Sequence, residues 1–422
     1  MIEFPRNLAE AVVGRWNNLV AGDYVTPPCP PVDLLNELLE TAYIVASAPE
    51  ETRYPQFNLL ALSKNEDGDY TDEFIQKWPF DKPRSLSIAE LRRLAPAVDV
   101  KKSGIWVEWG KDGWKIIGLI DLGTSWFRAR IGLEYSYKHP SCLFIQVDGP
   151  GRMRVHQGAF LVAMLIDGRI ERLEGIDLDI SLHPPINSGL KFLSENLVLP
   201  ASEPMRDFDS FAFTAMYNTY SGISNSIRLE GHGGSIIVVP AGEQRPVDGL
   251  KIKYPLNSSC LKLAFIEFMN ARTEHTDLVV QHESGKHVPK EQLSQFAFSV
   301  RETLTELVEA SRFVARLAGC DGAIVISEDL VVLGFGAEIT SNFNTKTKIV
   351  EHLGFGKSNF PPLDIERFGM RHRSAAKLVS QQSDYCVLVI SQDGPISTIW
   401  SEDGKINVKK NFYLVNLNLP WT

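Results

Sequence analysis

Two stretches of the sequence decide the fold class: Asp321–Ile339, DGAIVISEDLVVLGFGAEI, and Gly369–Ala376, GMRHRSAA. The first stretch opens with an acidic residue and a glycine and continues with three β-branched apolar residues. A short apolar run bounded by turn residues predicts a buried strand. The second stretch places an arginine on each side of a histidine, where the pattern indicates the start of a helix. We therefore expect a strand that follows an aspartate and a helix that begins with a basic cluster.

These residue types suit a polyphosphate bound together with a divalent cation. Asp321 offers a carboxylate, which is the ligand that hard cations prefer. The guanidinium forks of Arg371 and Arg373 match phosphate oxygens, and the N-terminus of a helix adds a positive end. In isolation, Asp321 would more often be a turn residue and the arginines a solvated helix start. The joint occurrence of the two motifs favours a site.

The two motifs resemble the signature of the diadenylate cyclase (DAC) domain family, which carries Asp-Gly-Ala and, downstream, Gly-Thr-Arg-His-Arg. The resemblance covers about the last half of the chain, because flanking segments are similar in the same order. These segments are Gly233–Val239 and Gly249–Ile252 as a first strand pair, Leu317–Ala318, Val387–Ser391 and Gly394–Ser397. A run of matching segments in the family's order outweighs the plain reading of each residue alone.

The resemblance implies a fold, an activity and partners. It implies a mixed β-sheet covered by helices, with one ATP per domain. Two such domains would face each other in a homo-oligomer, and the 3′-hydroxyl of each ATP would attack the α-phosphate of the other. The products would be cyclic di-AMP and two pyrophosphates, and the implied cofactor is Mg²⁺ or Mn²⁺.

The resemblance also implies a set of site residues. The implied catalytic residues are Asp321, Arg371, His372 and Arg373, with Asp321 and His372 as metal ligands. The implied ATP-binding residues are Gly322, Ala323, Gly336, Gly369, Met370, Ser374 and Ser391. In these roles the two arginines neutralise phosphate charge in the transition state, and Gly322 permits close approach of the backbone to the nucleotide.

The sequence departs from the family pattern in two places. Met370 stands where the family has threonine, which removes a hydroxyl that could contact phosphate. The connection Thr340–Arg367 is longer than in the family and contains Gly354–Ser358, GFGKS. A phosphate-binding loop of the form GxxxxGK[ST] would need glycine at Glu351, so that interpretation fails. We expect a loop over the ATP site or a dimer contact instead.

The N-terminal part predicts a second domain. Residues 104–174 alternate or run apolar between glycines, which predicts a β-rich module. The region resembles the sensor-type domain found ahead of some bacterial DAC domains. Four tryptophans are concentrated in and just after this stretch, and core packing is the favoured interpretation, with a ligand pocket as the alternative. They are Trp106, Trp109, Trp114 and Trp126. Proline-rich stretches near residues 184 and 200 suggest a division into domains 1–200 and 205–422, and an α/β (α+β) fold class.

Bulk properties exclude several function classes. The 422-residue chain has a net charge of −9, which argues against nucleic-acid substrates and anionic membrane surfaces. Five scattered cysteines favour a reducing, cytoplasmic setting over a disulfide or zinc framework. Neither a membrane-spanning apolar run nor a signal peptide is evident.

Helical patterns frame the two predicted domains. Residues 1–48 and 205–230 predict helices, and residues 290–317 predict one long helix. We expect its inward stripe to be Phe296, Val300, Leu304, Leu307 and Phe313. The polar stretch 276–289 predicts a solvated loop, so nearby His275, His282 and His287 are not expected to bind metal.

Two further functions remain open beside the cyclase. The chain could be a nucleotide-binding sensor that has lost turnover through Met370. It could also be a nucleotidyltransferase of the same fold that makes another dinucleotide. Retention of Asp321 and both arginines favours the enzyme, because a pure binding module does not need the metal ligand.

Overall fold

A computed structural model describes most of the chain. The described residues are 2–18, 27–49, 54–62, 75–123, 142–158, 160–172, 183–201, 205–229, 233–242, 248–341, 347–352, 360–391 and 396–412. The chain divides into two compact units. The first comprises Met1–Arg130 and Tyr137–Ile176, and the second comprises Ile131–Ser136 and Asp177–Thr422. This division falls earlier than the predicted boundary at residues 200–205, because α5 (His183–Leu193) packs against α6 (Met205–Leu229).

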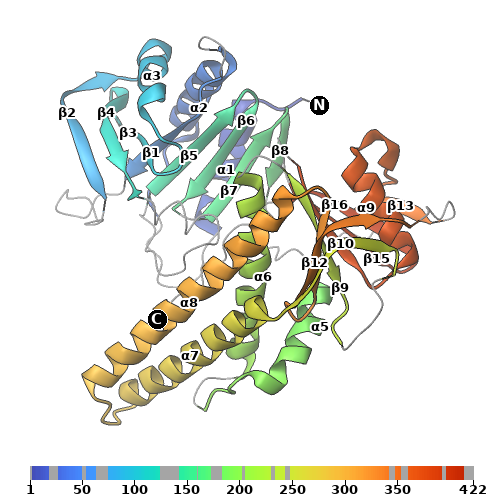
Figure 1. The fold of residues 1–422 in the computed structure, drawn as a ribbon. Helices are drawn as coiled ribbons and strands as arrows, with labels where there is room; N and C mark the ends of the chain where they lie inside the picture. The colour runs from blue at the N-terminus through green and yellow to red at the C-terminus, as the bar shows by residue number, and fades with distance from the viewer. Residues whose placement is uncertain are drawn as a thin grey trace. The chain divides into compact units, whose positions relative to one another are not determined.

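The first unit is built on an eight-stranded sheet with the order β2-β4-β3-β1-β5-β6-β7-β8. Its strands are β1 Phe57–Leu62, β2 Gln76–Ser85, β3 Ser103–Gly110, β4 Gly113–Asp121, β5 Cys142–Gly149, β6 Arg152–Gln157, β7 Phe160–Ile166 and β8 Arg169–Arg172. Its helices are α1 Pro5–Val13, α2 Val32–Ser47 and α3 Ile88–Leu94. Among the described strands of this unit, only β1 and β3 pair in parallel. The predicted β-rich module is therefore confirmed over the described residues (Figure 1).

One face of this sheet carries the main core of the unit. Side chains of α1, α2 and α3 pack there against inward residues of β1, β3, β5 and β6. Trp114 lies in this core, and its Nε1 donates a hydrogen bond of 2.7 Å to the carbonyl of Leu34. Trp106 is buried on the opposite face. The core role predicted for these two tryptophans is confirmed, whereas Trp126 lies outside the described residues.

The second unit contains a mixed eight-stranded sheet with the order β10-β12-β11-β9-β14-β15-β16-β13. Its strands are β9 Gly234–Val239, β10 Leu250–Ser258, β11 Ala323–Ser327, β12 Val332–Ile339, β13 Lys348–Glu351, β14 Cys386–Ile390, β15 Ile396–Glu402 and β16 Lys405–Phe412. Its other helices are α7 Cys260–Glu283, α8 Lys290–Arg316 and α9 Met370–Gln381. The predicted α+β class with a mixed sheet is confirmed. The predicted first strand pair is wrong, because β11 and β12 lie between β9 and β10.

Helix α9 covers one face of this sheet. Alternate residues of the central strands, among them Ile237, Val325 and Val387, form one apolar cluster with Ala375 and Leu378 of α9. The period of two in the strands and the three-to-four spacing in the helix produce matching apolar faces. The cluster holds α9 against β14 and β15.

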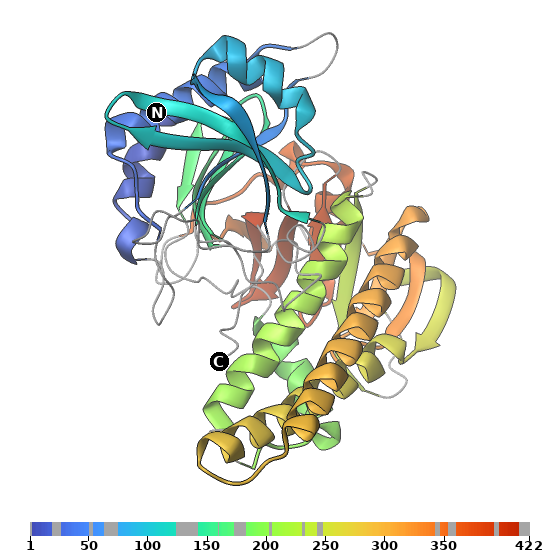
Figure 2. The same ribbon diagram turned by 90° about the vertical axis from the view of Figure 1, so that its left-hand side faces the viewer.

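Helices α7 and α8 follow β10 and precede β11 in the chain, and they form a long antiparallel hairpin (Figures 1 and 2). Helix α7 continues to Glu283, so the loop predicted for residues 276–289 is wrong for residues 276–283. Val300, Leu304 and Leu307 of α8 are buried as predicted. Phe313 is 65% exposed, because the buried stripe continues through Ser311, Val314 and Ala315 instead.

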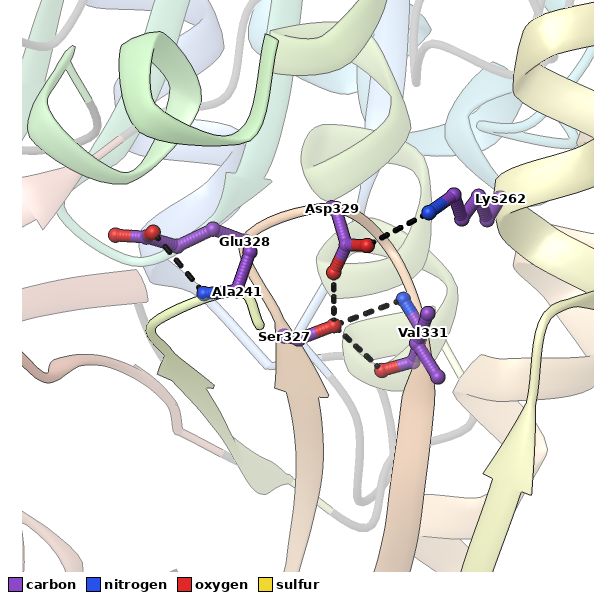
Figure 3. Close-up of polar contacts among 6 residues, drawn as sticks. All are labelled: Ala241, Lys262, Ser327, Glu328, Asp329 and Val331. Carbon is purple, nitrogen blue, oxygen red and sulfur yellow. Dashed lines mark hydrogen bonds and ion pairs between the residues drawn. The ribbon is translucent and has the colours of Figure 1, made fainter. Parts of the chain in front are cut away.

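The turn between β11 and β12 is fixed by buried polar groups (Figure 3). The hydroxyl of Ser327 accepts a 3.1 Å hydrogen bond from the backbone of Val331 and contacts the carboxylate of Asp329. The other oxygen of Asp329 pairs with Lys262 of α7 at 2.8 Å. Glu328 accepts a bond from the backbone of Ala241 at the end of β9. One end of the hairpin is thereby tied to the end of β11.

Two further findings concern expectations from the bulk sequence. All five cysteines lie in the described ranges, and none of them forms a disulfide. Within the part of the chain that the structure describes, no helix is long and apolar enough to cross a membrane.

Candidate functional site

The two signature motifs lie at one edge of the second sheet. Strands β9 and β11 are parallel, so both begin at this edge, and the antiparallel β14 ends there. Asp321 and Gly322 immediately precede β11, and Ser391 immediately follows β14. Strand β15 begins at the same edge, since Ile396 pairs with Ile390.

The register of the sheet aligns the residues just inside this edge. Ser235 of β9 pairs with Val389 of β14, and Val389 pairs with Ser397 of β15. On the other side of β9, Ile324 of β11 pairs with Ile236. The start of β11 and the start of β15 are therefore level with each other, separated by the two strands between them.

Gly322 must be glycine for the backbone to take this path. Its φ of +117° lies in a region that side chains avoid. A Cβ atom added there would lie 2.5 Å from the carbonyl carbon of Gly336, which itself has a φ of +66°. The close approach of these two glycines orients Asp321, whose side chain is exposed at the edge.

Replacing Gly322 with alanine is expected to lower the free energy of unfolding by about 3 kcal/mol, through strained φ and overlap with Gly336. Gly319→Ala is the matched control, because a Cβ atom there meets no atom within 4 Å and the position has no positive φ. Urea unfolding of the full chain measures both variants. Equal stability of the two variants would contradict the steric argument.

The basic cluster occupies the first turn of α9. Gly369 is the N-cap residue, and its carbonyl accepts bonds from the backbone of His372 and Arg373 at 3.1 and 3.3 Å. Met370, in place of the family's threonine, is 75% exposed. Arg371 is also exposed.

His372 points inward from the same turn. Its Nε2 lies 3.0 Å from the hydroxyl of Ser397, and its ring packs against Phe368 with centroids 5.2 Å apart. Burial and, to a smaller extent, the charge of Arg371 together lower the pKa of His372 to about 4. The imidazole is therefore neutral at pH 7.

Arg373 is partly engaged within its own segment. Its Nη1 donates a 2.8 Å hydrogen bond to the carbonyl of Phe368, and its Nε lies 3.9 Å from a carboxylate oxygen of Glu366. The guanidinium thus closes the loop that precedes α9. Ser374 follows it in the helix and is half-buried.

The aspartate and the histidine do not meet on one metal ion within a chain. Strands β11 and β15 are three strand spacings apart, which is about 14 Å at ~4.8 Å per spacing. Two ligands of a single hard cation lie within about 5 Å of each other. Among the described residues, no group of three or more His, Cys, Asp and Glu side chains is placed to hold a metal ion. Joint ligation by Asp321 and His372 therefore does not fit one chain, and a metal role for either residue alone stays a prediction.

Sequence reasoning missed the residues that support the basic cluster. Ser397 bonds to His372, and Lys410 of β16 lies over the ring of Phe368 at 5.3 Å. Lys410 also pairs with Glu351 of β13 at 2.9 Å. These contacts join residues far apart in the chain, so no local pattern signals them. The predicted loop Gly354–Ser358 lies outside the described residues.

Comparisons with known proteins concern mainly the first unit. Residues 24–121 match the model of a family described as "Probable sensor domain DACNV". The match includes α2, α3 and strands β1 to β4, and it ends before the second unit begins. The N-terminal region therefore contains a segment similar to a probable sensor domain, as the sequence resemblance predicted.

The other comparisons add little. No curated protein matches the chain. One similar solved structure is the crystal structure of a hypothetical membrane spanning protein from Bacillus cereus, from a structural genomics effort. It is 14% identical, covers 53% of this chain and 71% of its own, and has a TM-score of 0.23.

Proposed function

We propose that this chain is a diadenylate cyclase, which condenses two ATP molecules into cyclic di-AMP and two pyrophosphates under the control of its N-terminal sensor domain. The observation that carries the proposal is the position of both motifs at one edge of the same sheet. The Asp-Gly-Ala start of β11 and the Arg-His-Arg start of α9 share the edge where β9 and β11 begin. The family match of residues 24–121 adds a probable sensor domain upstream.

The spacing of the motifs supports two distinct tasks. About 14 Å between β11 and β15 is too wide for one ion and suits an extended nucleotide. In this arrangement, the arginines of α9 bind the triphosphate, and Asp321 faces the ribose end. Mg²⁺ or Mn²⁺ would be held by the Asp321 carboxylate together with phosphate oxygens, and it would supply charge neutralisation at the reacting phosphate.

The reaction then balances over two chains. Each 3′-hydroxyl forms a bond to the α-phosphorus of the opposite ATP, and the bond from that phosphorus to the β-phosphate oxygen breaks. Two pyrophosphates leave, and the two hydroxyl protons pass to solvent. Arg371 and Arg373 stabilise the negative charge that develops on the phosphates. His372 lies between them, bonded to Ser397 and packed against Phe368, and its part is to hold the turn that carries both arginines.

Product analysis tests the proposal. Purified full-length protein is incubated with ATP and either Mn²⁺ or Mg²⁺, and the products are identified by mass spectrometry. We expect cyclic di-AMP and two equivalents of pyrophosphate. A linear or mixed dinucleotide would identify a different nucleotidyltransferase. Binding of ATP with no dinucleotide under either metal would overturn the cyclase function.

A nucleotide-binding sensor without turnover is the second candidate. Two observations favour it: Met370 lacks the family's hydroxyl, and Arg373 is partly engaged by Phe368 and Glu366. Replacing Met370 with threonine separates the two candidates. A large gain of product from a weak wild type would show that the methionine limits turnover.

Assembly gives an independent expectation. One chain carries one pair of motifs, so turnover needs two chains related by a two-fold axis. We expect specific activity to fall on dilution as the oligomer dissociates. In an equal, randomly exchanged mixture with Asp321→Asn chains, activity per wild-type chain should fall to about half, because about half of wild-type chains are then in mixed pairs. The requirement for two chains would be contradicted if specific activity stayed constant over dilutions in which light scattering finds only monomer.

A further inference from the structure

Helix α5 is the first element of the second unit among the described residues. It begins at His183, and residues 173–182 join it to the end of β8 in the first unit. Its buried face is formed by Ile186, Gly189 and Leu193, which recur at helical spacing. The helix is thus placed between the N-terminal unit and the second sheet in the order of the chain.

The middle of α5 packs directly against the turn between β11 and β12. A Cβ atom added at Gly189 would overlap the carbonyl oxygen of Glu328 and lie 2.7 Å from its carbonyl carbon. It would also lie 2.7 Å from Cε of Met216 in α6. Glycine is a poor residue for the interior of a helix, and here it is required because the two backbones are so close.

The turn that α5 contacts is strained, and the strands that it joins pair irregularly. Leu330 is wholly buried and has a φ of +65°, in the left-handed region that residues with side chains seldom adopt. The register of β11 against β12 shifts between Ala323 and Val325 and again directly after Val325, whereas β11 pairs with β9 without a shift. The position of β12 against β11 therefore depends on what supports the turn.

Strand β12 connects this turn to the candidate site at the other end of the hairpin. A Cβ atom at Gly322 would lie 2.5 Å from the carbonyl carbon of Gly336 in β12. The carbonyl oxygen of Asp321 lies 3.5 Å from the place that a Cβ atom of Gly336 would take. A shift of β12 against β11 therefore moves the backbone beside Asp321.

The segment that follows α5, Ser194–Ala201, is here called the strap. Asn270 of α7 accepts a 2.8 Å hydrogen bond from the backbone of Val198 and donates a 3.3 Å bond to the carbonyl of Asn196. Asp277 of α7 accepts the backbone N–H of the last strap residue at 2.9 Å. These bonds are exposed, and water competes for the same groups, so the strap is held reversibly.

We infer that α5 and the strap are the element through which the N-terminal unit acts on the nucleotide site. Docked α5 supports the β11–β12 turn and so sets the backbone at Asp321, and release of α5 lets the hairpin shift. The inference rests on the proposed nucleotide site for its functional meaning. Its structural content, the support of the turn by α5, does not depend on catalysis.

Two variants of the full-length protein release α5 by different routes. Gly189→Ala places a methyl group against the carbonyl of Glu328, and Asn270→Ala removes both of its bonds to the strap. Asn187→Ala and Glu274→Ala are the matched controls, because these residues are exposed on the same two helices. If Gly189→Ala fails to fold, Asn270→Ala decides the outcome.

Hydrogen–deuterium exchange, read by mass spectrometry, measures the support of the turn. The informative peptides cover residues 183–193 and 324–332, and peptides from β5 and β6 of the first unit serve as the reference. In Gly189→Ala we expect exchange in α5 and in the turn to rise about tenfold, because a local opening that costs less free energy is populated more often. Asn270→Ala should raise it about threefold, since exposed bonds contribute less. Both controls should match wild type.

Coupling to the nucleotide site is measured with an ATP analogue in which a methylene group replaces the α,β-bridging oxygen, so that pyrophosphate cannot leave. Calorimetry in the presence of Mg²⁺ gives its Kd. In wild type we expect the bound analogue to slow exchange in α5 about fivefold, and in Gly189→Ala we expect its Kd to rise by a similar factor, because coupling between two sites is reciprocal. A merely structural support would change neither quantity.

The outcomes separate the support of the turn from the coupling. Wild-type exchange of the turn in both Gly189→Ala and Asn270→Ala would overturn the support by α5. Faster exchange of the turn, with the Kd of the analogue unchanged, would overturn the coupling to the nucleotide site. If the analogue does not bind to wild type at all, the proposed function fails and the coupling fails with it. Exchange in the two variants then decides by itself whether α5 supports the turn.

Discussion

Asp321→Asn is expected to abolish formation of cyclic di-AMP, by about a thousandfold or more, while leaving the fold intact. The side chain is exposed just before β11, so the exchange of one oxygen for an amide group disturbs no packing. What it removes is the negative charge that would hold the divalent cation at the reacting phosphate. Turnover is measured at saturating Mn²⁺, so that a simple weakening of metal affinity does not hide residual activity.

The control for this variant comes from the same sheet. Asp403 is exposed in the turn between β15 and β16, with a φ of +51° that asparagine also accepts. Asp403→Asn makes the same chemical change at a distant turn, and we expect wild-type turnover. Wild-type-like turnover in Asp321→Asn would remove this carboxylate from the mechanism.

Arg371→Ala is expected to lower turnover at least about a hundredfold, because one charge-assisted contact to a transition-state phosphate is worth a few kcal/mol. Arg371→Lys should recover part of the loss, since lysine keeps the charge without the bidentate fork. Single-turnover rates and ATP affinity are measured together, so that weaker binding is distinguished from slower chemistry. We expect the larger effect in the rate.

Arg373→Ala should also reduce turnover, with an added structural effect. Its guanidinium donates to the carbonyl of Phe368 and so closes the loop before α9. We therefore expect a lower unfolding temperature in this variant than in wild type. Arg367→Ala is the matched control, a largely exposed arginine of the same segment that pairs with Asp364. Full activity in both Arg371→Ala and Arg373→Ala would make the cluster purely structural.

Local sequence patterns were sufficient to predict individual strands and helices. The apolar run after Asp321 forms β11, and the basic cluster begins α9, because short-range hydrophobic periodicity and turn residues determine both. The start of α3 is a further case, because the Ser-x-x-Glu pattern at Ser87 forms a helix cap in which the Ser87 hydroxyl accepts a bond from the backbone of Glu90. Helix ends were less predictable: α7 runs into polar sequence because it packs along α8.

The order of the strands in the sheet and the contacts between distant residues could not be predicted from the sequence pattern. Nothing local shows that β11 and β12 separate β9 from β10, or that β15 aligns with β14 so as to bring Ser397 under His372. The exposure of Phe313 has the same cause, since the side of α8 that is buried depends on its partners. The motifs identified where the site lies, and the strand order determined which residues meet there.

The position of β9 in the second sheet has a consequence for how the chain is made. This strand, GSIIVV, is buried throughout and pairs on one side with β14, yet residues 240–385 separate the two strands. At about 5–20 residues per second, a ribosome needs roughly 7 to 30 s to synthesise that interval. During this time the strand lacks a partner along one edge and is a template for pairing with other chains. In the first sheet, residues 63–141 separate the buried strand β1 from its partner β5, so β9 stays without its neighbour for longer than β1 does.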